Sequence, residues 1–378
     1  MPRPEKHISF LIALLLTLGL SGWQAAWADD RLDAASGRQV EDAIRQEVQR
    51  QDLSGLAVGL VVDGELSYVK GFGFAEIESL STVSENSRFR WASLSKPLTA
   101  VVAVREAEAG HVDLEVPIQH YLPDYRHSEK LALKLRHLLS HQGGIGHYEE
   151  IRDWPAKVRA YLGSEAYASG YSALQASNAL GLGQQLLFHP GSRFLYSTFG
   201  YILAGGVLEA ASGKGFEELA REQVSEPLEL ASLGPDRAGL PWKVKGYRKD
   251  RNQIVASEND DVRWKLPGGG FSSNIRDLAR WMQALMAGPY LSEAQRRDLW
   301  REQLTSDGRH TGYGLGFGLS GSGRESRISH SGAQSQTRSL MAFYPQRRWG
   351  VVMLSNAEWA DLDAIRERLE AVLIRRPD

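Results

Sequence analysis

Residues 90–100 read Arg-Trp-Ala-Ser-Leu-Ser-Lys-Pro-Leu-Thr-Ala, and this stretch joins a strand-like run to the start of a helix. Apolar residues recur at helical spacing after Pro97, which falls in the first turn, and Gly110 marks the predicted end. Because residues three apart share a helix face, the Ser93 hydroxyl and the Lys96 amine are expected to meet. The arrangement predicts a serine nucleophile activated by an amine, and therefore acyl transfer through a covalent intermediate.

The chain holds a second copy of this pattern, Ser67-Tyr68-Val69-Lys70, in a strand-like segment. Residues three apart on a strand point to opposite faces, so this serine and lysine are not expected to meet. Ser93, at a junction between a strand and a helix, is the better candidate for a nucleophile. The alternative interpretation of Ser93 is a helix N-cap with an exposed Lys96 nearby.

Composition excludes several classes of function. The chain has 378 residues, no cysteine and a formal net charge of −2 at pH 7, with acidic and basic residues interspersed. A thiol nucleophile, a disulfide framework and a cysteine-based zinc site are therefore excluded. The balanced charge gives no electrostatic footprint for nucleic acid. We expect a small-molecule or peptide substrate and no cofactor, and the sequence sets no oligomeric state.

The first 28 residues have the pattern of a secretory signal peptide. Arg3 and Lys6 precede an apolar run over residues 8–20, and Ala26-Trp27-Ala28 forms a cleavage site of the usual type. The apolar run is short for a membrane span, and no later segment is long and apolar enough for one. We expect an exported bacterial protein, periplasmic or secreted, with no stable membrane span after cleavage.

Both ends of the remaining chain predict strands of one antiparallel sheet. Residues 56–62 and 65–74 flank an Asp63-Gly64 hairpin turn, and three further strands are expected within 327–354. Apolar residues at helical spacing predict a helix before the first strand and another at the C-terminal end. The predicted fold class is α+β: an antiparallel sheet flanked by N- and C-terminal helices, with a mostly helical inserted subdomain.

One domain is expected over residues 29–378. It divides into a sheet subregion, about 29–92 plus 287–378, and a helical subregion, about 93–286. Residues 233–265 are rich in charge, Trp and Tyr and predict a long surface excursion, which either lines a site or is simply solvated. The regularly alternating glycines of 312–318 predict a strand with one bare face.

A tyrosine forms the second chemical element. Tyr196 follows a His-Pro-Gly turn at 189–191 and stands just ahead of an apolar helix. A phenol has an ordinary pKa of about 10 and acts as a base near neutral pH only beside a cation, which Lys96 could supply. Taken alone, Tyr196 is better interpreted as a tyrosine that packs at a helix start with its hydroxyl satisfied.

The third element is His330-Ser331-Gly332 on a predicted strand. A glycine there would let a substrate backbone or acyl group approach closely. The N–H of Ala333 could pair with the N–H of Ser93 as an oxyanion hole. Taken alone, the same residues fit an edge-strand glycine beside a surface histidine.

Three histidines raise the question of a metal. His137 and His141 are four apart on a predicted helix, with His147 nearby, but no His-Glu-x-x-His arrangement is present. Core packing or loop anchoring is therefore preferred, and no metal site is expected. A Walker-type loop and a Gly-x-Ser-x-Gly elbow are both absent from the sequence.

The three elements follow one another in the order Ser-x-x-Lys, Tyr-x-Thr and His-x-Gly. With this order, the chain resembles the class C β-lactamase and penicillin-binding-protein superfamily of serine hydrolases, the peptidase family S12 type. The phrases around Tyr196 and His141 look most like the mitochondrial serine β-lactamase-like protein and its bacterial relatives, for which peptidase activity is expected. Further phrases that agree with the superfamily lie at 114–118, 121–123, 137–145, 267–273 and 313–318.

The resemblance implies a role for each matching residue. Ser93 is the acylated nucleophile, Lys96 and Tyr196 share proton transfer, and the N–H groups of Ser93 and Ala333 bind the oxyanion. The remaining substrate-binding positions that it implies are Thr198, His330, Ser331 and Gly332.

Two departures from the family bear on the substrate. Thr198 stands where Asn is common, and His330 stands where β-lactamases of this class carry Lys, which removes a permanent cation. Both changes weaken a β-lactamase interpretation. The leading hypothesis is an exported serine hydrolase that forms an acyl-enzyme on peptides, D-amino-acid-containing peptides or esters. The alternatives are a catalytically silent protein that binds muropeptides or a partner, and an acyltransferase on the same fold.

Overall fold

The computed structural model describes residues 32–125 and 132–374. The predicted signal peptide, residues 1–28, lies outside the described residues. Within the described ranges, no helix combines the length and the apolar character that a bilayer crossing requires.

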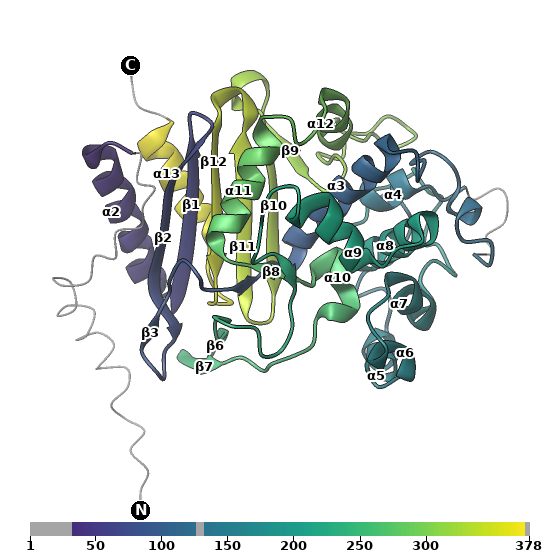
Figure 1. Cartoon of the computed structure of the whole chain (residues 1–378), viewed down its shortest axis with the longest axis horizontal. Coiled ribbons are helices and arrows are strands. Elements are labelled where there is room, and N and C mark those ends of the chain that lie inside the picture. Colours follow the sequence, from purple (N-terminus) through teal and green to yellow (C-terminus); the bar gives the residue numbers. More distant parts are fainter. Residues whose placement is uncertain (1–31, 126–131, 375–378) are drawn as a thin grey trace, which may run out of the picture.

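A seven-stranded antiparallel sheet forms one half of the described chain (Figure 1). The strand order is β3-β2-β1-β12-β11-β10-β9, so the N-terminal hairpin lies directly beside the C-terminal strands, as the sequence predicts. Its strands are β1 (Gly55–Val62), β2 (Glu65–Glu76), β3 (Ser81–Thr82), β9 (Gly318–Ser320), β10 (Arg327–Gln334), β11 (Thr337–Tyr344) and β12 (Trp349–Ser355).

The predicted hairpin turn sets the register of the first two strands. Asp63 and Gly64 have φ angles of 54° and 82°, the left-handed conformation that a two-residue hairpin loop needs at both positions. Val62 consequently pairs with Glu65 on either side of the turn. This pairing fixes which side chains of β1 and β2 enter the core.

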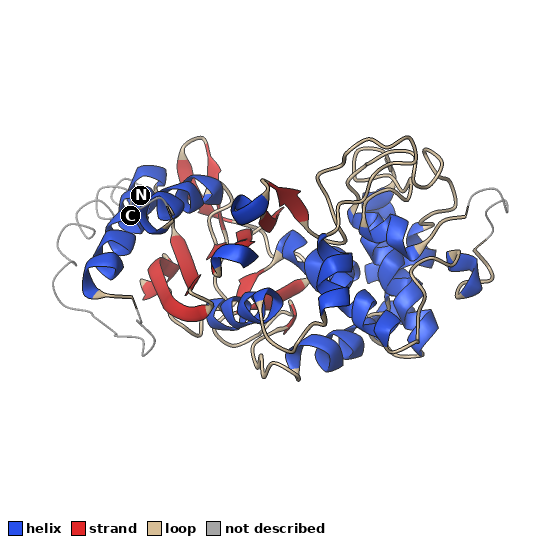
Figure 2. Cartoon of the chain, turned by 90° about the horizontal axis from the view of Figure 1, so that it is seen from above, coloured by secondary structure: helices blue, strands red, loops and turns tan. Residues whose placement is uncertain are grey.

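The two terminal helices cover one face of the sheet (Figure 2). α2 (Ala34–Gln51) and α13 (Leu362–Leu373) pack against each other there. Val40, Ile44 and Ile365 are fully buried in a core that they share with β1 and β12. The prediction that N- and C-terminal helices flank the sheet is confirmed.

α11 (Ile275–Met286) covers the opposite face of the sheet (Figure 1). Gly59 on β1 leaves room for this helix, because a Cβ at Gly59 would lie 2.9 Å from the Ala279 Cβ. α11 therefore belongs to the sheet layer, although its residues fall within the range expected for the helical subregion.

The other half of the chain is mostly helical, in line with the expected fold class (Figure 2). α8 is buried over most of its length and packs against α3, α4, α7 and α10, which explains why its sequence is apolar on every side. The helices of this half, together with α12 beside α3, are α3 (Ser95–Glu108), α4 (Leu135–Leu139), α5 (Trp154–Leu162), α6 (Glu165–Ala168), α7 (Ala173–Leu180), α8 (Thr198–Ser212), α9 (Phe216–Ala220), α10 (Leu266–Gly269) and α12 (Glu293–Trp300).

The segment 233–265 is more ordered than a solvated excursion. Its short strand β5 (Gly234–Pro235) joins β4 (Phe89–Arg90) and β8 (Phe271–Ser273) in a small sheet, and β6 (Tyr247–Asp250) pairs with β7 (Gln253–Ala256) as a hairpin. Its last residues lie at the candidate site described below. Of the two interpretations of this segment, the structure therefore supports the one in which it lines a site.

The prediction of a strand over 312–318 is wrong. Gly312 and Gly316 have φ angles of 66° and 77°, which break an extended conformation. The Gly316 N–H donates to the Leu139 carbonyl rather than to a neighbouring strand. The segment is an irregular loop, and β9 begins only at Gly318.

Candidate active site

Ser93 stands on a tight turn between β4 and α3. Ala92 has a φ of 48°, a left-handed conformation that is strained for a residue with a Cβ, and the 3₁₀ turn over Ala92–Leu94 runs directly into α3. The Ser95 hydroxyl donates to the Ala92 carbonyl at 2.8 Å and fixes this turn. Ser93 is partly exposed while its neighbours are buried. The predicted junction between strand and helix is therefore confirmed.

Lys96 lies fully buried beside Ser93. Its Nζ is 3.0 Å from Ser93 Oγ, 3.1 Å from Thr198 Oγ1 and 2.8 Å from the Gly268 carbonyl oxygen. A Cβ on Gly268 would lie 2.8 Å from Thr198 Cγ2, so a glycine is needed for this close approach. Burial lowers the pKa of Lys96 well below that of an ordinary lysine, and the charge of Lys265 lowers it further. Both effects favour the neutral amine, the form of Lys96 that can accept a proton.

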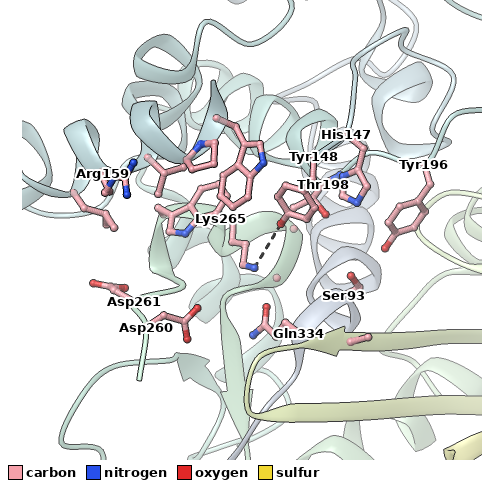
Figure 3. Close-up of a pocket in the computed structure, with 18 of the residues that line it drawn as sticks. Ser93, His147, Tyr148, Arg159, Tyr196, Thr198, Asp260, Asp261, Lys265 and Gln334 are labelled. Atoms are coloured by element: carbon pink, nitrogen blue, oxygen red, sulfur yellow. Dashed lines mark hydrogen bonds between the residues drawn. The ribbon is translucent and has the colours of Figure 1, made fainter. Parts of the chain in front are cut away.

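The Tyr196 phenol points toward Ser93 (Figure 3). The Lys96 Nζ lies 4.8 Å from the centroid of its ring. Burial raises the pKa of Tyr196 above its ordinary value, and a hydrogen bond with the Ser93 side chain only partly opposes this. Burial also lowers the pKa of Lys96, which disfavours a lasting positive charge beside the Tyr196 ring. Tyr196 therefore enters the site as a protonated phenol.

His141 holds the backbone on both sides of Tyr196. The Leu195 N–H donates to the His141 carbonyl at 2.8 Å, and the Ser197 N–H donates to His141 Nδ1 at 3.0 Å. The two rings lie 4.2 Å apart between centroids. Burial lowers the pKa of His141 well below its ordinary value, so the ring is the neutral acceptor that these contacts require. His141 is a positioning residue for Tyr196.

The other two histidines also anchor backbone. The Thr198 N–H donates to His147 Nδ1 at 3.2 Å, and the Lys134 N–H donates to His137 Nδ1 at 3.3 Å. Burial lowers the pKa of His147 and of His137 to about 4, which keeps both rings neutral as acceptors. The preference for loop anchoring is confirmed, and among the described residues no three His, Cys, Asp or Glu side chains gather as metal ligands.

His330 departs from its expected role at the substrate. Its Nδ1 lies 2.7 Å from the Ser331 carbonyl oxygen, which only accepts, so Nδ1 carries the proton and Nε2 accepts from the Tyr313 hydroxyl at 2.9 Å. Burial lowers the pKa of His330 to about 3. The ring is a neutral, buried link to Tyr313, neither a surface histidine nor a side chain that lines the cavity.

Strand β10 presents an open edge beside Ser93. β9 pairs with β10 only from Arg327 to Ser329, and beyond that point the exposed residues Ser331 and Ala333 line the cavity. Gly332 faces the other way. A Cβ there would collide with the Trp91 carbonyl and the Ser339 hydroxyl. The glycine permits β10 to pack on the nucleophile turn, and it does not serve the substrate approach that the sequence suggested.

A cavity of about 750 Å³ opens at Ser93 (Figure 3). Aromatic rings form one wall, with Trp154 and Trp264 stacked at 6.0 Å and Tyr148 4.9 Å from Trp154. The residues that line it are Ser93, His147, Tyr148, Trp154, Pro155, Val158, Arg159, Leu162, Tyr196, Thr198, Asp260, Asp261, Trp264, Lys265, Gly268, Gly269, Ser331, Ala333 and Gln334.

The structure thus brings together Ser93, Lys96, Tyr196, Thr198 and the β10 edge. Sequence reasoning missed three features of the site: Lys265, the aromatic wall, and the role of His141 in positioning Tyr196. One signal was available, since Arg263-Trp264-Lys265 is separated only by Leu266 from the Pro-Gly-Gly-Gly phrase that agrees with the superfamily. The part of the aromatic wall that α5 contributes does not lie beside a recognised phrase in the sequence.

The chain is similar to known proteins in sequence and in fold. The chain is 27% identical over 312 residues to the serine beta-lactamase-like protein LACTB, mitochondrial, of Homo sapiens, a match that covers 67% of this chain and 56% of the relative. The chain therefore spans little more than half the length of the curated relatives that it matches first. This similarity agrees with the phrases around Tyr196 and His141.

Two solved structures have the same fold. EstCE1, described as a hydrolase with promiscuous acyltransferase activity, aligns with a TM-score of 0.75 at 19% identity, over 90% of this chain and 98% of that one. A D-stereospecific amidohydrolase from Streptomyces sp. aligns with a TM-score of 0.70 at 20% identity, over 90% and 99%. A family model described as Beta-lactamase matches residues 40–373. Because this match covers most of the sequence, the chain belongs to the β-lactamase family.

Proposed function

We propose that the protein is a serine hydrolase that cleaves ester or amide bonds through an acyl-enzyme at Ser93. The observation that carries this proposal is the fully buried Lys96, whose Nζ lies 3.0 Å from Ser93 Oγ. The family of the chain supports it, because β-lactamase-like folds are generally hydrolytic. The names of its structural neighbours, an amidohydrolase and a hydrolase with acyltransferase activity, agree with it.

Lys96 is the base for acylation. A neutral amine has two N–H groups and one lone pair, and Nζ has three polar contacts. The two N–H groups donate to the Gly268 carbonyl and the Thr198 hydroxyl, which leaves the lone pair facing the Ser93 hydroxyl. Ser93 Oγ attacks the substrate carbonyl carbon as its proton passes to Lys96 Nζ.

Collapse of the tetrahedral intermediate needs a proton for the leaving group. The N–H groups of Ser93 and Ala333 hold the oxyanion while the bond to the leaving group breaks. Tyr196, a protonated phenol pointing at Ser93, donates its proton to that group and is reprotonated by the Lys96 ammonium. Water then attacks the acyl carbonyl carbon as its proton passes to Lys96 Nζ, and the ester bond to Ser93 Oγ breaks as Lys96 returns that proton to Oγ.

The substrates we propose are peptides, including those with D-amino acids, and esters. β-Lactams are disfavoured because His330 offers no cation on β10, since burial lowers its pKa to about 3. Thr198 is committed to Lys96 through its hydroxyl and offers no side-chain amide to a substrate. Acyl transfer to a second nucleophile is the alternative outcome of the same acyl-enzyme, and the description of EstCE1 favours including it.

A substrate panel with acyl-enzyme trapping tests the proposal. p-Nitrophenyl butyrate should give a burst of p-nitrophenol close to one equivalent where acylation outruns deacylation, and acid-quenched samples should carry the acyl mass on Ser93. D-Ala-D-Ala peptides, L-peptides, benzylpenicillin and added amine or alcohol acceptors then separate peptidase, β-lactamase and transferase activity. Folded protein that binds muropeptides but acylates with none of these compounds would establish the silent binding protein instead.

We also propose that the protein is exported. The support is the cationic start, apolar run and Ala-Trp-Ala site in residues 1–28. Expression in a Gram-negative bacterium followed by osmotic shock should release a protein whose N-terminus is Asp29. Full-length protein in the cytosolic fraction would contradict this.

A further inference from the structure

The cavity beside Ser93 has a cation that the proposed mechanism does not use. We propose that this cavity binds the acyl part of a substrate that carries a carboxylate, and that Lys265 pairs with that carboxylate. The inference rests on the proposed acyl-enzyme at Ser93 and names the chemical class of its acyl group. His330 on β10 is neutral and does not line the cavity, whereas Lys265 does, so Lys265 would supply the cation that β10 lacks.

Lys265 has no acidic partner among the described residues. Its Nζ contacts the Tyr148 hydroxyl at a weak 3.5 Å and lies 5.5 Å from the centroid of the Trp264 ring (Figure 3). Its charge acts on both Lys96 and His147, so its field extends to the reacting groups. A cavity wall with an unpaired ammonium attracts an anion.

The two acids of the cavity are already paired. Asp260 Oδ1 accepts from Arg90 Nη1 at 2.5 Å, and the Arg90 side chain is almost fully buried. Asp261 Oδ2 accepts from Arg263 Nη2 at 2.6 Å and from the Tyr167 hydroxyl at 2.7 Å. Neither carboxylate neutralises Lys265, so the net field inside the cavity favours a negative group rather than a positive one.

An unsatisfied amide lies next to Lys265. The Gln334 Nε2 is buried and has no hydrogen-bond partner in the described part of the chain. A Cβ built on Gly269 would lie 3.5 Å from Gln334 Oε1 and 3.5 Å from Lys265 Cε, so both side chains face the same point. A buried amide without a partner costs free energy unless a ligand satisfies it. An ammonium and an amide N–H together match a carboxylate.

The location of Lys265 assigns this carboxylate to the acyl group. Tyr196, which protonates the leaving group, lies on one side of Ser93, and Lys265 lies on the other (Figure 3). The rings of Tyr148, Trp154 and Trp264 line the same cavity as Ser93 and Lys265. The substrate class is therefore an acyl group with an apolar body and a carboxylate beyond it.

The test compares two esters that differ only in charge. The p-nitrophenyl monoester of adipic acid carries a terminal carboxylate, and the p-nitrophenyl ester of adipamic acid carries the neutral amide of the same shape. The full chain should hydrolyse the first with a kcat/KM about tenfold higher than the second, since a charge-assisted hydrogen bond is worth at least that factor. This ratio should fall as ionic strength rises.

Variants assign the preference to Lys265. Lys265→Met should bring the ratio close to one, Lys265→Arg should preserve it, and Gln334→Glu should lower it by placing a carboxylate beside Lys265. Lys157→Met is the matched control, because Lys157 lies on α5 but outside the cavity lining. Its ratio should stay at the wild-type value. The ratio cancels any effect of Lys265 on the Lys96 pKa, because both esters share that step.

Binding without turnover separates this inference from the proposed function. In Ser93→Ala, the anilide of adipic acid should bind about tenfold more tightly than the anilide of adipamic acid, measured by calorimetry. If acylation fails but this binding preference holds, only the proposed function falls. If both esters acylate Ser93 at equal rates, or Lys265→Met leaves the ratio unchanged, the carboxylate site is overturned.

Discussion

The two Ser-x-x-Lys segments of this chain have the same pattern and different surroundings. On β2, the Ser67 hydroxyl donates to the carbonyl of Glu65 at 2.9 Å, and Lys70 forms an ion pair with Glu41 on α2. On the turn into α3, the Lys96 amine is fully buried and touches Ser93 at 3.0 Å. The strand keeps its serine and lysine with separate partners, and the helix start brings its pair together.

This difference teaches that the environment of the lysine decides its chemistry. Lys70 has a carboxylate partner and partial solvent exposure. Lys96 has hydroxyl and carbonyl neighbours and no exposure, so its pKa is lowered and the amine can accept a proton. A nucleophile therefore needs a buried amine that is not paired with a carboxylate.

Substitution of the lysine in each segment should give the largest difference in activity. Lys96→Met should lower kcat/KM for ester hydrolysis by about a thousandfold, the usual contribution of a general base. Lys70→Met should stay within about twofold of wild type, because this partly exposed ion pair with Glu41 has no contact with Ser93. Initial rates with p-nitrophenyl butyrate measure both. A large loss in Lys70→Met with intact folding would remove the distinction between the two segments.

A glycine comparison tests the packing of β10 on the nucleophile turn. Gly332→Ala should lower activity by about a hundredfold, since the new methyl group displaces the Ala333 oxyanion donor, and should destabilise the fold by about 1–3 kcal/mol. Gly318→Ala is the matched control on β9, where a Cβ would meet Ser329 O at an ordinary 3.4 Å. Thermal melts and rates on the same samples separate the two effects. Wild-type activity in Gly332→Ala would contradict the account.

The role of His141 in positioning Tyr196 predicts a smaller loss of activity, which is confined to kcat. His141→Leu removes the acceptor for the Ser197 N–H and should lower kcat by roughly tenfold to a hundredfold with little change in KM, because Tyr196 loses its position. His141→Asn, which restores an acceptor oxygen, should recover part of kcat. His111→Leu, at an exposed histidine, is the control. If His141→Leu and His141→Asn instead change kcat and KM to the same extent, His141 has a purely structural role.

The pH profile should show the smallest effect. Lys96 acts as a base only when neutral, so the rising limb of kcat/KM against pH marks its deprotonation. Burial and Lys265 both disfavour the ammonium, which places the limb below the pKa of 10.5 of an ordinary lysine. Lys265→Met removes one of these causes and should move the limb to higher pH. A shift to lower pH would contradict the electrostatic account.

Local patterns predicted most of the fold and the nucleophile. The Asp63-Gly64 turn, the apolar spacing of α13 and the spacing of Ser93 and Lys96 are properties of adjacent residues, and each appears as expected. The glycines of 312–318 misled because an alternating pattern does not reveal positive φ angles at Gly312 and Gly316.

Contacts between distant segments could not be derived in this way. The burial that makes His330 neutral depends on Tyr313, and the approach of β10 to the turn depends on Gly332 facing Trp91. Lys265 and Gln334 meet over Gly269 only because α10 and β10 converge at Ser93. The spacing of residues along the chain does not predict such contacts, because tertiary packing sets them.

Covalent labelling tests most directly the claim that Ser93 alone is the activated serine. A fluorophosphonate probe should add one label to wild type and to Ser67→Ala, with peptide mapping placing it on Ser93, and should add none to Ser93→Ala. Circular dichroism establishes that each variant is folded. A label on Ser67 or another serine, or no label on folded wild type, would contradict the account.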